Sequence, residues 1–399
     1  MSTNHASVPA STLLGVTAIS IAGLLLSGCA VPATTPATGD TAAPSTPAVT
    51  RPAAPQGDLP EELQGQLQSA LEQVMADYDV PGAVAGVWVP DEGSWTTAVG
   101  LADIEGNVAV TTDMTWPIRS ITKSYTVTLI LQLADEGALS LDDTIDEYID
   151  GITNGDQITL LQLANMSSGN AEYVNDAFLA DWMKDPAKIY TLEELNSFVI
   201  DQPAQFTPGS EYLYTNSNTN LLGGVIEKVT GQSYARALTE RILTPLGQTG
   251  TTYITNLADW TDPHPTGYQK PGDVLEAQEE NASILGAAGS LFSTLDDGRV
   301  WAETLGTGSL LKPETQELRQ IGHQIPKPPY DLYAVGMGET NGWLGHNGEG
   351  VGFTAATFHD TATGANIVVY MNRSDVPGAH PADQAFRALS DVLASGAGQ

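Results

Sequence analysis

The stretch Ser120-Ile121-Thr122-Lys123, with the apolar run that follows it to Ala134, decides the fold. Apolar residues of this run fall on nearly every face of a helix, at Ile121, Tyr125, Val127, Leu129, Ile130, Leu131 and Leu133. That pattern is typical of a buried helix rather than of an amphipathic surface helix. Gly137 is the predicted stop. A serine therefore stands at the first turn of a buried helix, with a lysine one turn later on the same face.

This serine and this lysine can form a nucleophile and its base. A serine hydroxyl attacks when a neighbouring group removes its proton, and a lysine can do so if burial lowers its pKa. The helix N-terminus adds N–H groups that favour a developing negative charge. The alternative is a capping serine, with Lys123 pointing to solvent. A second S-x-x-K, from Ser309 to Lys312, runs into Pro313, so we expect a surface loop or helix end there.

Length, charge and histidine spacing limit the classes of function. The 399 residues can form two or three average domains or one large domain with an insertion, and a hydrophobic fraction of 41% supports a sizeable core. A net charge of −33 disfavours nucleic acid and anionic membrane surfaces as partners. The six histidines show no ligand spacing, so we expect no metal site and no cofactor.

The N-terminal segment is typical of an exported lipoprotein. Residues 12–26 form an apolar run of signal-peptide length, and Leu26-Ser27-Gly28-Cys29 resembles a bacterial lipobox. We predict a signal peptide over residues 1–28, lipidation at Cys29 (the only cysteine) and anchoring to the outer face of the bacterial cell membrane. Because the first eleven residues contain no Lys or Arg, an ordinary signal peptide and secretion stay open. Residues 29–57, rich in Ala, Pro and Thr, are the predicted tether.

The rest of the chain, residues 58–399, is predicted to form one α+β domain. Period-two patterns predict strands near both of its ends, at 83–89, 95–102, 351–358 and 365–371. Helical spacing predicts helices at 61–78, 142–149, 160–165, 218–229, 300–305, 314–321 and 382–393. Strands at both ends with helices between them predict an antiparallel sheet flanked by the terminal helices, with an inserted helical lobe at roughly 119–284.

Two more motifs follow the serine and lysine, namely Tyr214-Thr215-Asn216 and His346-Asn347-Gly348. With these three motifs in order, residues 60–395 resemble the penicillin-recognising serine hydrolases, which include class C β-lactamases, D-alanyl-D-alanine carboxypeptidases, D-amino-acid peptidases and related esterases. Each motif is weak alone, but the order and the flanking text, such as Leu221-Leu222-Gly223, are specific. The resemblance implies a β-lactamase/transpeptidase-like fold and catalysis through an acyl-enzyme.

The resemblance implies a role for each residue of the first two motifs. Ser120 attacks the carbonyl carbon, while Lys123 and the phenol of Tyr214 relay the proton to the leaving group. A nearby lysine cation is expected to lower the pKa of that phenol. Asn216, whose amide both donates and accepts, is expected to bond the substrate amide and the lysine.

The third motif is expected to begin a strand that lines the cleft. By resemblance, His346 supplies polarity or positive charge beside Tyr214; the alternative is a strand-end histidine bonded locally. Gly348 is expected to let the substrate backbone lie against the strand. The backbone N–H groups of Glu349 and Ser120 are the implied oxyanion donors.

Glu349 separates this sequence from the carboxypeptidases of the family, which grip a terminal carboxylate with hydroxyl and cationic groups. Here an anion follows Gly348, and residues 335–340 contain no Arg or Lys. Our first prediction is a monomeric, D-alanyl-D-alanine carboxypeptidase-like serine peptidase acting on cell-wall peptides, with peptidoglycan as a candidate partner. The anion weakens the strict carboxypeptidase and β-lactamase interpretations and leaves room for a peptidase, amidase or esterase. The alternative prediction is therefore an esterase or D-amino-acid amidase/β-lactamase of the same fold. A non-catalytic lipoprotein that binds peptidoglycan or β-lactams is the third possibility.

Overall fold

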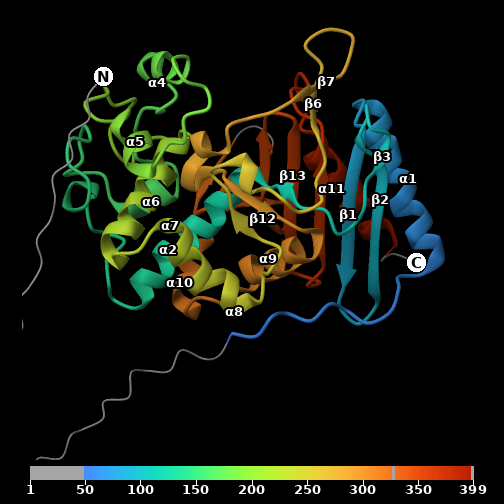
Figure 1. Ribbon diagram of the computed structural model, residues 1–399. Helices are drawn as coiled ribbons and strands as arrows, with labels where there is room; N and C mark the ends of the chain where they lie inside the picture. Colours follow the sequence, from blue (N-terminus) through green and yellow to red (C-terminus); the bar gives the residue numbers. More distant parts are fainter. Residues whose placement is uncertain (1–48, 326–328, 397–399) are drawn as a thin grey trace, which may run out of the picture. The chain divides into compact units, whose positions relative to one another are not determined.

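A nine-stranded antiparallel sheet is the frame of the structure, a computed structural model that describes residues 49–325 and 329–396 (Figure 1). At its centre β1 (Gly82–Val89) pairs with β14 (Asn366–Met371), and the strand order is β3-β2-β1-β14-β13-β12-β11-β10-β9. Its other strands are β2 (Gly93–Asp103), β3 (Val108–Ala109), β9 (His323–Gln324), β10 (Leu332–Tyr333), β11 (Gly338–Thr340), β12 (Trp343–Gly350) and β13 (Phe353–Asp360). The predicted antiparallel sheet, formed from both flanks of the chain, is confirmed.

Both faces of this sheet are buried, because the strands β1 and β14 carry buried apolar side chains on both faces. On β14, Val368 and Tyr370 belong to one hydrophobic core, whereas Ile367, Val369 and Met371 belong to the other. Successive residues of a strand point to opposite faces, so the two cores lie on opposite sides of the sheet. One core is covered by the terminal helices α1 (Glu61–Asp77) and α11 (Pro381–Gly396), and the other by α9 (Leu295–Thr307) and the helical lobe (Figure 1).

The helical lobe lies between the two halves of the sheet in sequence. Its α-helices are α2 (Thr122–Asp135), α3 (Leu160–Ala164), α4 (Asp176–Trp182), α5 (Leu192–Ser197), α6 (Asn216–Thr230), α7 (Tyr234–Leu238) and α8 (Thr244–Leu246); α10 (Pro313–Arg319) follows α9. Short strands join the lobe to the sheet region: β4 (Trp116–Pro117), β5 (Thr252–Tyr253) and β8 (Leu291–Ser293) form one small sheet, and β6 (Gly267–Gln269) and β7 (Glu276–Gln278) form another.

Two sequence predictions differ from the observed helices. The predicted helix over 142–149 is a single 3₁₀ turn, Ile145–Glu147, because the Asp143 carboxylate accepts the Ser140 N–H at 2.7 Å and offers the backbone an alternative to a helix. The helix predicted over 300–305 begins earlier, at Leu295, where the Thr294 side chain caps it. As expected, Ser309 and Lys312 are exposed in a turn, so the second S-x-x-K forms no buried pair.

The predicted signal peptide, Cys29 and the tether up to residue 48 lie outside the described residues. Over the described ranges, no helix is both long enough and apolar enough to cross a membrane. Residues 49–57, the described end of the predicted tether, belong to the same compact unit as the rest of the domain.

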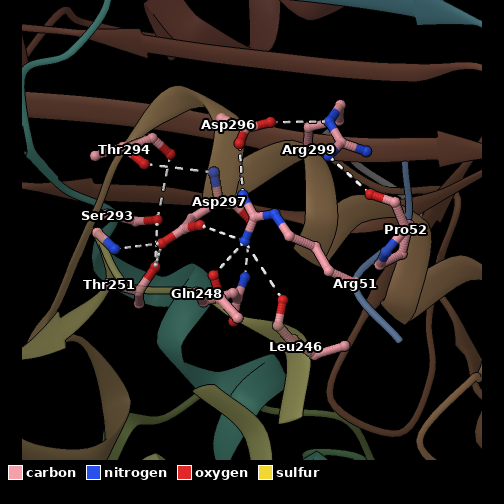
Figure 2. A network of polar contacts seen from close by, with 12 residues as sticks. Arg51, Pro52, Leu246, Gln248, Thr251, Ser293, Thr294, Asp296, Asp297 and Arg299 are labelled. Atoms are coloured by element: carbon pink, nitrogen blue, oxygen red, sulfur yellow. Dashed lines mark hydrogen bonds and ion pairs between the residues drawn. The ribbon is translucent and has the colours of Figure 1, made fainter. Parts of the chain in front are cut away.

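Arg51 holds this N-terminal segment against the domain (Figure 2). One of its Nη atoms donates to the Gly247 carbonyl at 2.5 Å and to Asp297 Oδ1 at 2.9 Å, and the other pairs with Asp296 at 2.5 Å. Arg299 donates to the Pro52 carbonyl at 3.0 Å, and this second hydrogen bond also holds the N-terminal segment against the domain. Burial raises the pKa of Asp297, and the hydrogen bonds from Arg51 and Thr251 partly offset this effect. The domain therefore starts upstream of its first helix.

We predict that Arg51→Ala lowers the free energy of unfolding by about 1–3 kcal/mol, because it leaves the buried Asp297 carboxylate without its charged partner. Urea denaturation followed by circular dichroism measures this loss. The matched control is Arg236→Ala, which removes an exposed ion pair with Glu240 and is expected to cost no more than about 1 kcal/mol. Equal effects of the two variants would contradict the assignment.

Candidate active site

Ser120 lies in a 3₁₀ turn, Arg119–Ile121, that leads directly into α2. Thr122 to Leu131 are all buried, as the apolar run predicts. The polar residues of this helix are accommodated by local bonds: the Ser124 hydroxyl donates to the Ile121 carbonyl at 2.6 Å and accepts from the indole of Trp301 at 2.8 Å. The turn that carries Ser120 is therefore attached to the rigid core of the domain.

Lys123 is completely buried, and its ammonium nitrogen has three acceptors. Nζ lies 3.0 Å from Ser120 Oγ, 2.7 Å from Asn216 Oδ1 and 3.0 Å from the Ala288 carbonyl. Burial lowers the pKa of Lys123 to about 7, and the negative charge of Glu172 partly opposes this shift. The alternative of a solvent-facing lysine is thus excluded, and the side chain can accept a proton from Ser120 near neutral pH.

Tyr214 lies beside this pair, but its phenol differs from the prediction. The Lys123 ammonium lies over the face of the Tyr214 ring, 4.9 Å from its centroid. Although the residue as a whole is 36% exposed, its hydroxyl faces Ser120, and burial of this end raises the pKa of the phenol more than the Ser120 hydrogen bond lowers it. The expected lowering by a lysine cation is therefore wrong. A phenol that keeps its proton can serve as a general acid.

Asn216 is the first residue of α6, and Glu172 holds it in place. The Asn216 side chain accepts from Lys123, while its backbone N–H donates to Glu172 Oε2 at 2.7 Å. The other carboxylate oxygen of Glu172 accepts the Tyr173 N–H at 3.0 Å. A carboxylate at a helix N-terminus is favourable. Sequence reasoning missed Glu172 because no motif surrounds it in the long loop that precedes α4.

His346 lies on β12 and is neutral, which corrects the expected positive charge beside Tyr214. Its Nδ1 lies against the carbonyl oxygen of Asn347 and therefore carries the proton, which leaves Nε2 to accept from the Tyr333 hydroxyl at 3.2 Å. The ring is 1% exposed, and burial lowers its pKa to about 3. The locally bonded alternative describes His346 better, although its ring remains 6.2 Å from that of Tyr214.

Gly348 and Asn347 complete the strand beside the nucleophile. A Cβ atom at Gly348 would lie 2.2 Å from the Ile118 carbonyl oxygen and 3.0 Å from the Ser120 nitrogen. The glycine therefore lets β12 approach the nucleophile turn, whereas the sequence interpretation assigned this space to substrate. Asn347 lines the cavity, and its side chain accepts from the Tyr330 hydroxyl at 2.6 Å. From the sequence, only the position of Asn347 inside the third motif could have indicated that this residue lines the cavity.

A cavity of about 580 Å³ opens beside Ser120. Tyr212, Tyr214 and Tyr330 form an aromatic part of its wall, and Asn216 and Asn347 contribute amides.

Glu349 lines the same cavity near the first turn of α11. Its Oε1 accepts the Asp375 N–H at 3.3 Å. Burial lowers the pKa of the neighbouring His380, and the negative charge of Glu349 partly opposes this shift. His380 donates from Nε2 to the Gly348 carbonyl at 3.0 Å, and Asp383 follows it on α11. Sequence reasoning missed His380 and Asp383 because only the sheet brings α11 to the third motif.

Arg119 is the one arginine or lysine among the described residues that line this cavity. Its guanidinium forms a buried ion pair with Glu280 at 2.5 Å, so its charge is already neutralised. Asp383 is likewise paired, with Arg387 at 2.8 Å, so Glu349 is the charged carboxylate of this lining that no arginine or lysine of the described residues neutralises. Over the described ranges, no group of His, Cys, Asp and Glu is arranged to hold a metal ion.

Comparison with known proteins agrees with this geometry. The model of the Beta-lactamase family matches residues 67–391. This chain belongs to the Beta-lactamase family. This chain is 26% identical over 309 residues to Protein flp of Staphylococcus aureus, and the match covers 75% of this chain and 59% of the relative. It is 28% identical over 241 residues to the D-aminopeptidase of Brucella anthropi, covering 59% of this chain and 45% of that enzyme. The chain thus spans roughly half of these relatives' lengths.

Solved structures show the same fold. A D-stereospecific amidohydrolase from Streptomyces sp. superposes with a TM-score of 0.71 at 28% identity, covering 82% of this chain and 98% of that one. A D-amino acid amidase from Ochrobactrum anthropi SV3, in complex with D-phenylalanine, superposes with a TM-score of 0.73 at 21% identity, covering 84% of this chain and 100% of that one. The predicted family and fold are therefore confirmed.

The pKa of Lys123 predicts the pH dependence of acylation. A base acts only when it has lost its proton, so kcat/KM should fall about tenfold per pH unit below about pH 7. Because Glu172 raises the pKa of Lys123, Glu172→Gln should move this acid limb to lower pH. Initial rates measured across the acid and neutral range test both statements. Glu240→Gln, an exposed and remote change, should leave the limb in place; an unmoved limb in Glu172→Gln would contradict the assignment.

Proposed function

We propose that this protein is an acylating serine amidohydrolase that acts on amides or short peptides of D-amino acids bearing a free amino group. The observation that carries the proposal is the buried Lys123 ammonium, 3.0 Å from the Ser120 hydroxyl, with a pKa lowered to about 7. Such a lysine is neutral in a large fraction of molecules near neutral pH and can take the serine proton.

The reaction then follows from the roles that the residues can fill. Ser120 Oγ attacks the amide carbonyl carbon while its proton passes to Lys123. The N–H groups of Ser120 and Glu349 are the proposed donors to the oxyanion. The protonated phenol of Tyr214 gives its proton to the leaving nitrogen as the C–N bond breaks and takes up the proton that Lys123 received, which leaves an acyl-enzyme that water hydrolyses.

The charge of the cavity supports a substrate with an ammonium group over one with a terminal carboxylate. Arg119 is paired with Glu280 and Asp383 with Arg387, whereas Glu349 lines the cavity without an ion pair to any arginine or lysine of the described residues. A substrate carboxylate near Glu349 meets like charge, and a substrate ammonium meets opposite charge. This arrangement favours an amidase or aminopeptidase over the D-alanyl-D-alanine carboxypeptidase that was the first prediction.

The names of the relatives support the same substrate class, since they include a D-aminopeptidase, a D-stereospecific amidohydrolase and a D-amino acid amidase. The activities in these names belong to those proteins and are proposed for this chain. Action on peptidoglycan, export and lipid anchoring through Cys29 likewise remain proposals that rest on the sequence.

A product assay tests the proposed function. The protein is incubated with D-alaninamide and, separately, with an acyl-D-alanyl-D-alanine peptide, and ammonia and free D-alanine are measured. We expect hydrolysis of the amide in the parent and loss of at least about 10³-fold in Ser120→Ala, because the nucleophile is absent. Release of D-alanine from the peptide alone would overturn the amidase assignment in favour of the carboxypeptidase. Unchanged activity in Ser120→Ala would overturn the site itself.

Changing the charge at Glu349 should change the substrate preference. Glu349→Lys replaces a repelling anion by a cation, so the ratio of kcat/KM for the acyl-D-alanyl-D-alanine peptide over D-alaninamide should rise by about tenfold or more. Glu314→Lys, an exposed site on α10, makes the same charge change outside the cavity and should leave the ratio unchanged. An equal ratio in both variants would show that the cavity charge does not select the substrate.

A further inference from the structure

The residue before the nucleophile has an unusual backbone conformation. Arg119 has φ of 54°, in the left-handed region that residues with a Cβ atom disfavour. A residue held in this region persists only where its surroundings impose it, and such residues concentrate at functional sites. The peptide bond that this residue makes with Ser120 carries the N–H proposed above as an oxyanion donor.

The Arg119 side chain provides the contacts that impose this conformation. Its guanidinium pairs with Glu280 at 2.5 Å and donates to the Val351 carbonyl at 2.7 Å, and it lies over the Phe353 ring, 5.5 Å from the centroid. The side chains of Arg119 and Glu280 are only 5% and 11% exposed. A buried guanidinium bonded to two separate acceptors has little freedom, so the backbone from which it extends is fixed as well.

The strand next to the nucleophile is shaped around this arginine. A Cβ at Gly350 would lie 2.7 Å from Arg119 Nε, and a Cβ at Gly348 would lie 2.9 Å from Arg119 Cβ. Two glycines on one face of β12 therefore leave room for one arginine, and a larger residue at either position would displace it. Sequence reasoning did not consider Arg119, which precedes the motif.

The same ion pair also reaches the segment that orients the lysine. Glu280 immediately precedes the Asn281-capped turn Ala282–Ala288, and the Ala288 carbonyl at the end of that turn accepts from Lys123 at 3.0 Å. One ion pair thus connects the backbone of the nucleophile with the segment that bonds its base.

We propose that the Arg119–Glu280 ion pair is a positioning device that holds Arg119 in its left-handed backbone conformation. By fixing the peptide bond between Arg119 and Ser120, the pair directs the Ser120 hydroxyl and N–H at the substrate carbonyl. Arg119 acts through Ser120 and is not itself a catalytic residue. The inference rests on the proposed function only in taking Ser120 as the nucleophile, and it is independent of the substrate class.

The test separates the backbone conformation from the ion pair. Because glycine adopts positive φ without strain, whereas alanine does not, Arg119→Gly and Arg119→Ala differ in conformation while both remove the guanidinium. Both are made together with Glu280→Gln, so that no buried carboxylate is left without a partner. The readout is the burst of p-nitrophenolate from p-nitrophenyl acetate, a neutral ester that reports acylation without any D-amino-acid preference.

Relative to the parent protein, we expect the alanine variant to acylate about 100-fold more slowly, since a misplaced oxyanion donor costs 10²–10³-fold. The glycine variant should lose less than about tenfold, with KM within about twofold of the parent in both. If the alanine variant does not fold, Arg119→Lys in the natural background replaces it. That variant keeps the charge but loses the planar fork, and it should acylate about tenfold more slowly at unchanged KM.

Asp296→Asn is the matched control, because it weakens the contact of another buried arginine, Arg299, away from the cavity (Figure 2). It should lower the melting temperature without changing the burst. The proposal is overturned if the glycine and alanine variants lose acylation rate equally, or if only KM rises. It is also overturned if Arg119→Lys acylates at the parent rate, or if Asp296→Asn acylates as slowly as the Arg119 variants. A parent that shows the burst, absent in Ser120→Ala, but does not hydrolyse D-alaninamide would refute the proposed substrate class and leave this test intact.

Discussion

The structure depends on the burial of one ammonium group. Lys123 has no access to solvent, and desolvation of a charged amine is costly unless each donor finds an acceptor. Its acceptors come from three separate segments: the nucleophile turn, the start of α6 and the turn that ends at Ala288. These segments must converge for the lysine to be tolerated at all, so the burial that adjusts its pKa also specifies how the helical lobe packs against the sheet.

A group of tyrosines buries a second ionisable side chain of the site, His346. Tyr330 and Tyr333 surround His346, and the edge of Tyr214 packs against Tyr333 with a centroid separation of 5.6 Å. The rings exclude water, which raises the pKa of each phenol and keeps the histidine neutral. A cavity wall made of uncharged, rigid groups preserves the effect of the few charges that remain, because water does not screen them.

The spacing of residues along the sequence correctly predicted those parts of the site that come from neighbouring residues of the chain. The three-residue separation of Ser120 and Lys123 and the apolar run behind them predicted the buried nucleophile helix. The order of three motifs predicted which distant residues meet. Spacing could not show that His346 is neutral, because its environment comes from Tyr330 and Tyr333 through the sheet. It also could not indicate Glu172, Asp383 or Arg119, whose effects depend on contacts with Asn216, the cavity and Glu280.

The pairing of β1 with β14 has a consequence for how the protein folds. β1 is made long before β14, yet they are neighbours in the interior of the sheet, with Val84 opposite Tyr370. The two hydrophobic cores cannot close until β14 has left the ribosome, and contacts between such distant segments form slowly. The central part of the sheet, and with it the site beside β12, can therefore be completed only after β14 has been made.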